Sequence, residues 1–207
     1  MSTEERELTP FGKRFRGFCP VVIDVETGGF NANTDALLEV AAVLLTINEA
    51  GEFFCQETIA THVKPFEGAN LDPASLEVNG IDPFHPLRIA LPEKEALQKI
   101  FKPIQKHVKL NKCTRAILVG HNAFFDLGFI NAAVERTKLK NNPFHPFSNF
   151  DTVTLGALAY SQTVLSRIVE AANIEWDNSS AHSAIYDAEK TAAVFCDVMN
   201  KWQRLQT

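Results

Sequence analysis

The chain has 207 residues, of which 45% are hydrophobic and 22% are charged, and its formal net charge is −5. This length suits one domain, taken as residues 1–207 with a core from about 14 to 202, and the negative charge argues against indiscriminate nucleic-acid binding. The longest apolar run, residues 40–45, is too short to cross a bilayer, and the polar amino terminus does not resemble a secretory signal. Because the four cysteines are scattered without a CxxC pair, we expect a reduced cytoplasmic protein with no association with a membrane.

The hydrophobic pattern predicts strands first and then an alternation of strands and helices. Strands are expected over residues 21–25, 37–47 and about 53–63, and the turn NEAGE separates the last two. A short helix is expected in DPASLEVNG, with Pro73 near its start and Gly80 past its end. Longer helices are expected over about 92–108, 124–136 and 183–203, with strands at 116–119 and ending near Asp151. This order predicts an α/β fold with a mixed five-stranded sheet flanked by helices.

Two acidic residues interrupt the first strand, in the stretch PVVIDVETGGF at residues 20–30. Because successive side chains of a strand point to opposite faces, Asp24 and Glu26 share one face. Two neighbouring carboxylates are costly to remove from water unless something positive lies between them. The pair is therefore a candidate functional site.

Two later segments add acids at the edges of predicted elements. LVGHNAFFDLGF places Asp126 in the first turn of a helix, just after the strand at 116–119, where sites collect in such sheets. AHSAIYDAEKTAAVF places Asp187 near the start of the final helix, five residues after His182. That spacing puts two side chains about 140° apart on a helix, so His182 is better placed on the preceding loop. Alone, each residue has a structural explanation, such as a favourable charge at a helix amino terminus for Asp126.

Together, the blocks VIDVETGGF, GHNAFFDLGF and AHSAIYDAE resemble the DEDDh exonucleases, and the stretches ANLDPASLEVNGIDP and NPFHPFSNFDT resemble the ribonuclease T family among them. The resemblance runs from about residue 14 to 202. It implies a ribonuclease H-like exonuclease fold and hydrolysis of the last phosphodiester at a 3′ end, with release of 5′-mononucleotides.

The acids also indicate a cofactor, because oxygen ligands without cysteine favour Mg²⁺, for which Mn²⁺ can substitute. Two such ions can stabilise both the attacking and the leaving oxygen of a phosphoryl displacement. The resemblance implies that Asp24 bridges both ions, that Glu26 and Asp187 complete one site and that Asp126 supports the other. His182 is the expected general base, since its side chain titrates near neutral pH. His121 is the rival base, and we favour a structural role for it in the GHN turn.

The resemblance further implies that aromatic side chains hold the substrate by stacking on terminal bases. The matching positions are Phe30, Phe125 and Phe147, although Phe125 could equally pack in the core. This chain has Ala74 and Val78 where relatives carry an acidic residue and an aromatic one. A preference for one terminal base therefore cannot be carried over from them.

Basic clusters in GKRFRGF and RTKLK suit a nucleic-acid backbone, although short basic stretches are often only solvated surface. Arg14 and Arg16 precede the first strand and Arg115 precedes the strand leading to Asp126, so these charges lie at the opposite strand ends from the acids. They could serve a neighbouring subunit. In ribonuclease T-like enzymes the resemblance implies a homodimer whose basic patch, here Arg14, Arg16, Arg115 and Lys140, holds RNA for the partner's site.

Three functions are compared. The first is a 3′ to 5′ exoribonuclease that trims tRNA and other structured RNAs, with single-stranded DNA open as a further substrate. The second is a DNA-directed proofreading or repair exonuclease that uses the same site. The third is a catalytically silent binding module, which is disfavoured because all four acids and His182 are present.

Overall fold

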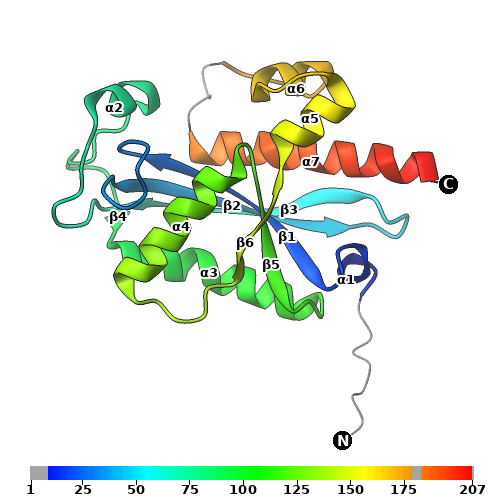
Figure 1. Cartoon of the computed structure of the whole chain (residues 1–207), viewed down its shortest axis with the longest axis horizontal. Helices are drawn as coiled ribbons and strands as arrows, with labels where there is room; N and C mark the ends of the chain where they lie inside the picture. The colour runs from blue at the N-terminus through cyan, green and yellow to red at the C-terminus, as the bar shows by residue number, and fades with distance from the viewer. Residues whose placement is uncertain (1–8, 179–182, 207) are drawn as a thin grey trace, which may run out of the picture.

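The computed structural model describes residues 9–178 and 183–206 and contains a six-stranded mixed sheet with the strand order β4-β3-β2-β1-β5-β6 (Figure 1). The strands are β1 (Phe18–Thr27), β2 (Leu37–Ile47), β3 (Phe53–Val63), β4 (Ala90–Leu91), β5 (Arg115–Gly120) and β6 (Phe144–Asp151). β1, β2 and β3 form an antiparallel meander, whereas β5 pairs in parallel with both β1 and β6. The carboxyl ends of β1, β5 and β6 therefore meet at one edge of the sheet.

Helices cover the sheet on both sides. They are α1 (Pro10–Arg14), α2 (Pro73–Asn79), α3 (Glu93–Leu110), α4 (Ala123–Thr137), α5 (Thr152–Tyr160), α6 (Leu165–Ala171) and α7 (Ala184–Gln206). α7 packs across β1, β2 and β3, and α5 and α6 pack against α7. α3 and α4 lie together on the other side of the sheet, and α2 stands apart near the ends of β1 and β2 (Figure 1). No helix in the described ranges has an apolar stretch long enough to span a bilayer.

The core lies between the sheet and its helices and explains why the central strands form. β2 is buried from Leu37 to Leu45 because α7 covers one of its faces and α3 the other, and its run of Val, Ala and Leu suits that position. Phe195 of α7 and Phe129 of α4 are both fully buried, and each anchors its helix to the sheet. Asp24 and Glu26 thus lie on a strand that is held firmly from both sides.

The α/β fold class predicted from the sequence is confirmed, and the meander strands 37–47 and 53–63 have the predicted bounds. The sheet has six strands rather than five, because the two-residue β4 pairs in parallel with His62 and Val63 of β3. A strand of two residues is too short to be predicted from a hydrophobic pattern. α1 was also not predicted. Its N-cap is Thr9, whose hydroxyl accepts the Gly12 N–H, and the helix buries Phe11 against the rings of Phe53 and His107.

Candidate active site

The central strand β1 carries the first two acids of the candidate site. Its antiparallel register places Asp24 opposite Ala41 and Glu26 opposite Glu39 of β2. Val21, Ile23 and Val25 point to the other face and are buried in the core. The alternation therefore leaves Asp24 and Glu26 half-buried on one face, as the sequence predicted.

Asp126 reaches the end of β1 from the first turn of α4. Its carboxylate is 3% exposed, and its Oδ1 accepts the Val25 N–H at 3.0 Å. Gly120 makes this approach possible, because a Cβ there would lie 3.0 Å from Ala123 Cα and 3.1 Å from Asp126 Oδ2. The Asp151 carboxylate accepts the N–H groups of Asn122 and Ala123, which fixes the amino end of α4.

Asp187 joins the site from the first turn of α7, where its N–H donates to the Ser183 carbonyl at 2.9 Å. Carboxylate oxygens of Asp24, Glu26 and Asp187 lie within 4.8 Å of one another. Asp126 also lies close enough to act on Asp24, and its charge does so more strongly than that of Glu26 or Asp187. Four acids from β1, α4 and α7 thus converge around Asp24.

Burial and mutual repulsion make these carboxylates hold protons more tightly than free ones. Burial is the main reason that the pKa of Asp24 and that of Asp126 are raised well above their ordinary value. The pKa of Glu26 is raised to about 8, first by burial and then by the charges of Asp187 and Glu39, although Asn79 counteracts this with a hydrogen bond. Among the described residues, the charges that act on Asp24 belong to the carboxylates of Asp126, Glu26, Asp187 and Glu39.

This donor set fits divalent cations. Carboxylate oxygens are the ligands that Mg²⁺ and Mn²⁺ prefer, and a cation among Asp24, Glu26 and Asp187 would offset the repulsion that raises their pKa values. A tetrahedral zinc site with thiolate ligands is not suggested, because the group contains only carboxylates.

One prediction follows from the pKa of Glu26. Below pH 4.5, the folded and unfolded states both hold its proton; between pH 4.5 and about 8, only the folded state does. Stability of the metal-free protein is therefore lost as pH rises through this window, by about 1.4 kcal/mol per pH unit at most. We expect Glu26→Gln, measured by thermal unfolding in a chelator from pH 5 to 8.5, to reduce this fall, leaving the part that comes from Asp24 and Asp126, and to unfold at the higher temperature at pH 8. Identical pH profiles for the two proteins would show that Glu26 has an ordinary pKa.

Glu39 is a fifth carboxylate near the site that the sequence reasoning missed. It is 7% exposed and directly opposite Glu26, and its Oε1 lies 3.6 Å from His62 Nδ1. In the sequence, Glu39 is an acid inside an apolar strand, the same pattern that drew attention to Asp24 and Glu26. Its closeness to the site became clear only from the pairing of β2 with β1, which places Glu39 opposite Glu26.

Of the two histidines considered as general bases, His121 lies within the described residues and His182 does not. His182 lies outside the described residues, just before Ser183 and the start of α7. His121 is half-buried, and its Nδ1 lies 3.0 Å from the hydroxyl of Thr152, which itself donates to the Gly120 carbonyl. Burial lowers the pKa of His121. These contacts agree with a structural role of His121 in the GHN turn.

An aromatic cleft of about 330 Å³ opens beside the acids. Its lining consists of Val25, Glu26, Thr27, Gly29, Phe30, Ala74, Ser75, Val78, Asn79 and Phe125. Phe30 is 83% exposed, and its ring meets that of Phe125 edge to face at 6.2 Å. The loop that carries Phe30 is held by Asp35, which approaches Gly29 so closely that a Cβ would lie 2.0 Å from its Oδ2.

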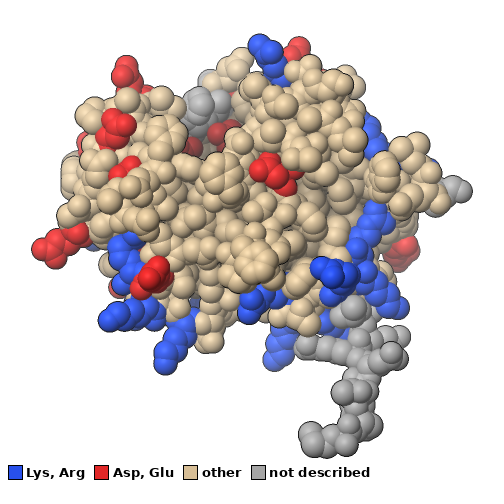
Figure 2. All heavy atoms as spheres, viewed as in Figure 1, with Lys and Arg blue, Asp and Glu red and all other residues tan. Residues whose placement is uncertain are grey.

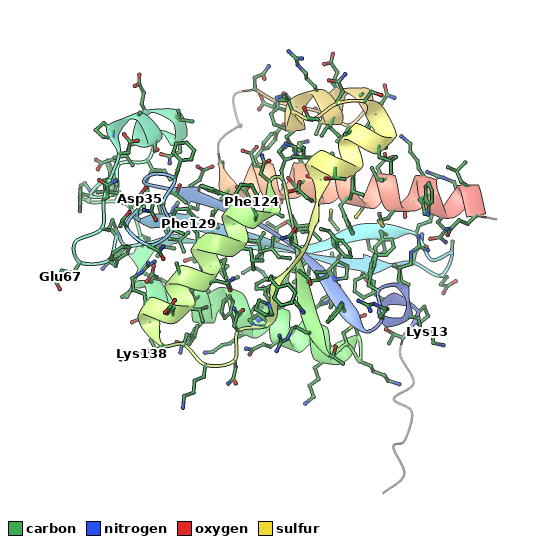
Figure 3. All side chains as sticks on the ribbon, viewed as in Figure 1. Lys13, Asp35, Glu67, Phe124, Phe129 and Lys138 are labelled. Carbon is green, nitrogen blue, oxygen red and sulfur yellow. The ribbon has the colours of Figure 1, made fainter. Side chains whose placement is uncertain are left out.

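The other aromatics are arranged differently from the sequence expectation. Phe147 is 76% exposed and stacks edge to face on His145, but it is not among the residues that line the cleft. Phe125 is half-buried against Phe129, so it belongs to both the core and the cleft. Phe124 was not singled out, although it is 71% exposed at the amino end of α4 (Figure 3). Phe124 and Phe125 are adjacent in the sequence, and only the rotation of α4 about its axis decides which of them faces solvent and which faces the cleft.

The basic residues gather away from the acids. The basic patch, as it is called below, consists of Arg14, Arg16, Arg115 and Lys140. Arg115 is the first residue of β5 and the others precede β1 or β6, so all four lie near the amino ends of these mutually parallel strands, away from the acids. Phe18 pairs with Arg115, and the Thr114 N–H donates to the Gly17 carbonyl, so the segments carrying Arg16 and Arg115 are adjacent. Figure 2 shows Lys and Arg side chains concentrated along the lower side of the view, and acidic ones in a recess near the top. Lys13 and Lys138 lie on this lower side and Asp35 on the upper one (Figure 3).

Comparison with known proteins agrees with this geometry. The exonuclease family RNase_T matches residues 21–195. The chain is 56% identical to a ribonuclease T of Hahella chejuensis over 98% of its own length and 93% of the relative's. It is 58% identical to a ribonuclease T of Vibrio vulnificus over 99% of its own length and 94% of the relative's.

Solved structures show the same fold at low sequence identity. Exonuclease I of E. coli in complex with a dT13 oligonucleotide superposes with a TM-score of 0.69 at 19% identity, over 91% of this chain and 42% of that one. An exonuclease I of Methylocaldum szegediense gives a TM-score of 0.68 at 18% identity, with the same coverage. The present chain thus spans less than half of those chains, and the likeness concerns the fold.

Proposed function

The chain belongs to the ribonuclease T family of exonucleases, and on this basis we propose that its four carboxylates bind divalent cations for removing nucleotides from RNA 3′ ends. It is a 3′ to 5′ exoribonuclease, a metal-dependent hydrolase of phosphodiester bonds. A DNA-directed enzyme is not favoured, because relatives that match nearly the whole chain are named ribonuclease T. The observation that supports the metal site most strongly is the convergence of acids from three separate segments on Asp24.

In the proposed mechanism, Asp24 would serve as a ligand of both cations, Glu26 and Asp187 would complete one site, and Asp126 would support the other. The cations, when bound, stabilise negative charge on the attacking and leaving oxygens. Val25 keeps one oxygen of Asp126 oriented through its N–H. His182, five residues before Asp187 in the sequence, is proposed to accept the proton of the attacking water. Mg²⁺ is the proposed ion, in two sites, and Mn²⁺ is expected to substitute for it.

This function is tested with one RNA, such as a tRNA with extra 3′ nucleotides, labelled at either end. A 3′ label should be released at once as a 5′-mononucleotide, whereas a 5′ label should shorten one nucleotide at a time. Single-stranded DNA of identical sequence serves as the comparison and is proposed as a weaker substrate. Release of the 5′ label first would contradict the proposal.

We place the terminal base in the aromatic cleft, with Phe30 and Phe125 as stacking surfaces and Phe147 outside as a further contact. Both polar groups of the Asn79 amide are engaged, because its Nδ2 donates to the Thr27 carbonyl and its Oδ1 accepts the Ile81 N–H. The side chains of Ala74 and Val78 offer no hydrogen bond, and the Thr27 hydroxyl donates to the Gly29 carbonyl, which leaves the Ser75 hydroxyl as the neutral polar group of the lining with no such bond described. The cleft is therefore suited mainly to stacking.

Phe30→Ala tests this placement. Stacking contributes about 1 to 3 kcal/mol per base, so we expect the variant to bind a short RNA roughly 5- to 150-fold more weakly, as measured by fluorescence anisotropy in Ca²⁺. Phe84→Ala is the matched control, because Phe84 is 75% exposed and does not line the cleft. Equal affinities of the two variants would remove Phe30 from the substrate site.

We further propose a homodimer in which the basic patch of one subunit holds RNA for the site of the other. β1 begins at Phe18, two residues after Arg16, and its six residue steps from Phe18 to Asp24 span about 20 Å at 3.3 Å per residue. The basic patch is therefore too far from the acids of its own subunit to bind a phosphate that lies beside them. Lys140 extends it toward Lys102, beside which it lines a shallow groove.

Subunit exchange tests the shared site. An Asp24→Asn protein and an Arg14→Ala, Arg16→Ala protein should each be almost inactive on tRNA, whereas the mixture should regain activity because one intact patch then faces one intact site. A single chain carrying all three substitutions, mixed with Asp24→Asn, is the control and should stay inactive. Failure of the first mixture despite exchange verified by native mass spectrometry would contradict the model. A cytoplasmic location, where stable RNAs mature, forms part of the same proposal.

A further inference from the structure

Two cysteines that are far apart in the sequence meet where β3 packs on α7. The contacts of Phe53 with Asn200 and of Thr58 with Glu189 place Cys55 beside Cys196, and each of the two thiols is the main influence on the pKa of the other. Cys55 follows Phe53 by two residues, so both point to the face that α7 covers, and the Phe53 ring meets that of Phe195 at 6.2 Å. The pair therefore belongs to the packed contact between these two elements.

Hydrogen bonds on both sides of this pair fix the elements relative to each other. The Phe53 N–H donates to Asn200 Oδ1 at 2.7 Å, and Asn200 Nδ2 donates to the Phe53 carbonyl at 2.9 Å. Beyond the pair, Thr58 Oγ1 donates to Glu189 Oε1 at 2.8 Å. Residues 189, 196 and 200 are separated by seven and four positions, which places them on one face of α7. The two thiols are thus held together rather than meeting by chance.

Access from solvent distinguishes this pair from the other two cysteines. Cys55 is exposed and Cys196 is 6% exposed. Cys113 also acts on the pKa of Cys19, but these two cysteines are 3% and 0% exposed. A small oxidant can reach Cys55 directly, whereas the second pair is enclosed in the core. The chain thus contains its own matched control.

We propose that Cys55 and Cys196 form a dithiol that hydroperoxides oxidise reversibly to an intramolecular disulfide joining β3 to α7. The Cys55 thiolate attacks the peroxide oxygen, which breaks the O–O bond and gives a sulfenic acid and water. Cys196 then attacks the Cys55 sulfur and releases a second water. In sum, two thiols and one hydrogen peroxide give one disulfide and two waters, and two electrons pass from sulfur to the peroxide.

The electrostatics favour Cys55 as the attacking group. The hydrogen bond from Cys196 lowers the pKa of Cys55, against smaller opposing effects of burial and the Glu189 charge. The pKa of Cys196 is raised by the same hydrogen bond and by burial. The exposed thiol is therefore the nucleophile, and the buried one resolves the sulfenic acid.

The bond would close a loop of more than 100 residues in the unfolded chain without moving the elements apart, and loops of this length give large stabilisation. We expect the oxidised protein to unfold several degrees higher than the reduced one. Exonuclease activity should stay within about twofold, because the pair lies more than two helical turns beyond Asp187 on α7. The disulfide would protect Cys55 from irreversible oxidation.

The experiment treats the whole protein with substoichiometric hydrogen peroxide, blocks remaining thiols with iodoacetamide and maps peptides by mass spectrometry. We expect a loss of 2 Da, a Cys55–Cys196 peptide at least tenfold more abundant than any Cys19–Cys113 peptide, a higher unfolding temperature, and reversal by a phosphine reductant. Cys55→Ser should abolish the cross-link and the temperature shift while keeping the fold. Linkage of Cys19 to Cys113 first, disulfides between chains, or direct conversion of Cys55 to sulfinic acid would each overturn the proposal.

Discussion

Asp24→Asn is expected to lower the rate of RNA trimming by at least about 1,000-fold while leaving the fold intact. The substitution keeps the volume of the side chain but removes the charge that both proposed cation positions share. Removing a single stabilising group at a charged transition state typically costs 100- to 1,000-fold, and the loss of a shared ligand should affect both positions. Trimming of a 5′-labelled RNA under single-turnover conditions measures the effect.

The stability of the same variant supplies an independent readout. Asp24 is repelled by Asp126, Glu26 and Asp187, so the neutral amide should leave the unfolding temperature of the metal-free protein unchanged or higher. Asp82→Asn is the matched control, because Asp82 accepts the Phe84 N–H in an exposed turn that asparagine reproduces. Retention of more than a tenth of the activity by Asp24→Asn would contradict the shared-ligand role.

His182→Ala is expected to lower the catalytic rate constant about 100- to 10,000-fold, the usual contribution of a general base. Binding should hardly change, because the histidine is proposed to move a proton rather than to hold the substrate. Single-turnover rates measure the first effect, and the affinity for a short RNA in Ca²⁺ measures the second. A large loss of affinity would reassign His182 to binding.

His121→Ala separates the two candidate bases in the same assay. His121 contacts Thr152 and has a pKa lowered by burial. Its loss should therefore lower the unfolding temperature and leave the rate of the chemical step nearly unchanged. If His121→Ala instead shows the larger loss of rate at unchanged stability, the general base has been assigned to the wrong histidine.

Much of the site could be predicted because it violates the patterns around it. Asp24 and Glu26 stand out in an apolar strand, and Asp126 follows a short strand whose end was expected at the same edge of the sheet. The structure brings these acids together with Asp187. The apolar pattern also sufficed for β2, which is buried from Leu37 to Leu45, and β3 has its predicted bounds although only Phe53, Thr61 and Val63 in it are buried.

What the sequence did not reveal depends on register and helix phase. Glu39 gains its meaning only because β2 pairs it with Glu26. Phe124 and Phe125 are adjacent, and only the orientation of α4 makes one exposed and the other part of the cleft. The contact of Cys55 with Cys196 likewise follows from the alignment of α7 on β3, which no local pattern encodes.

Anomalous diffraction from crystals grown in Mn²⁺ tests the central claim most directly, because it locates the cations rather than inferring them from rates. The account predicts two strong peaks, both within about 2.5 Å of Asp24 oxygens, one of them shared with Glu26 and Asp187 and the other on the side of Asp126. The same experiment on Asp24→Asn should show neither peak at full strength. An active protein whose Mn²⁺ peaks lie away from these carboxylates, or that shows no peak at saturating Mn²⁺, would contradict it.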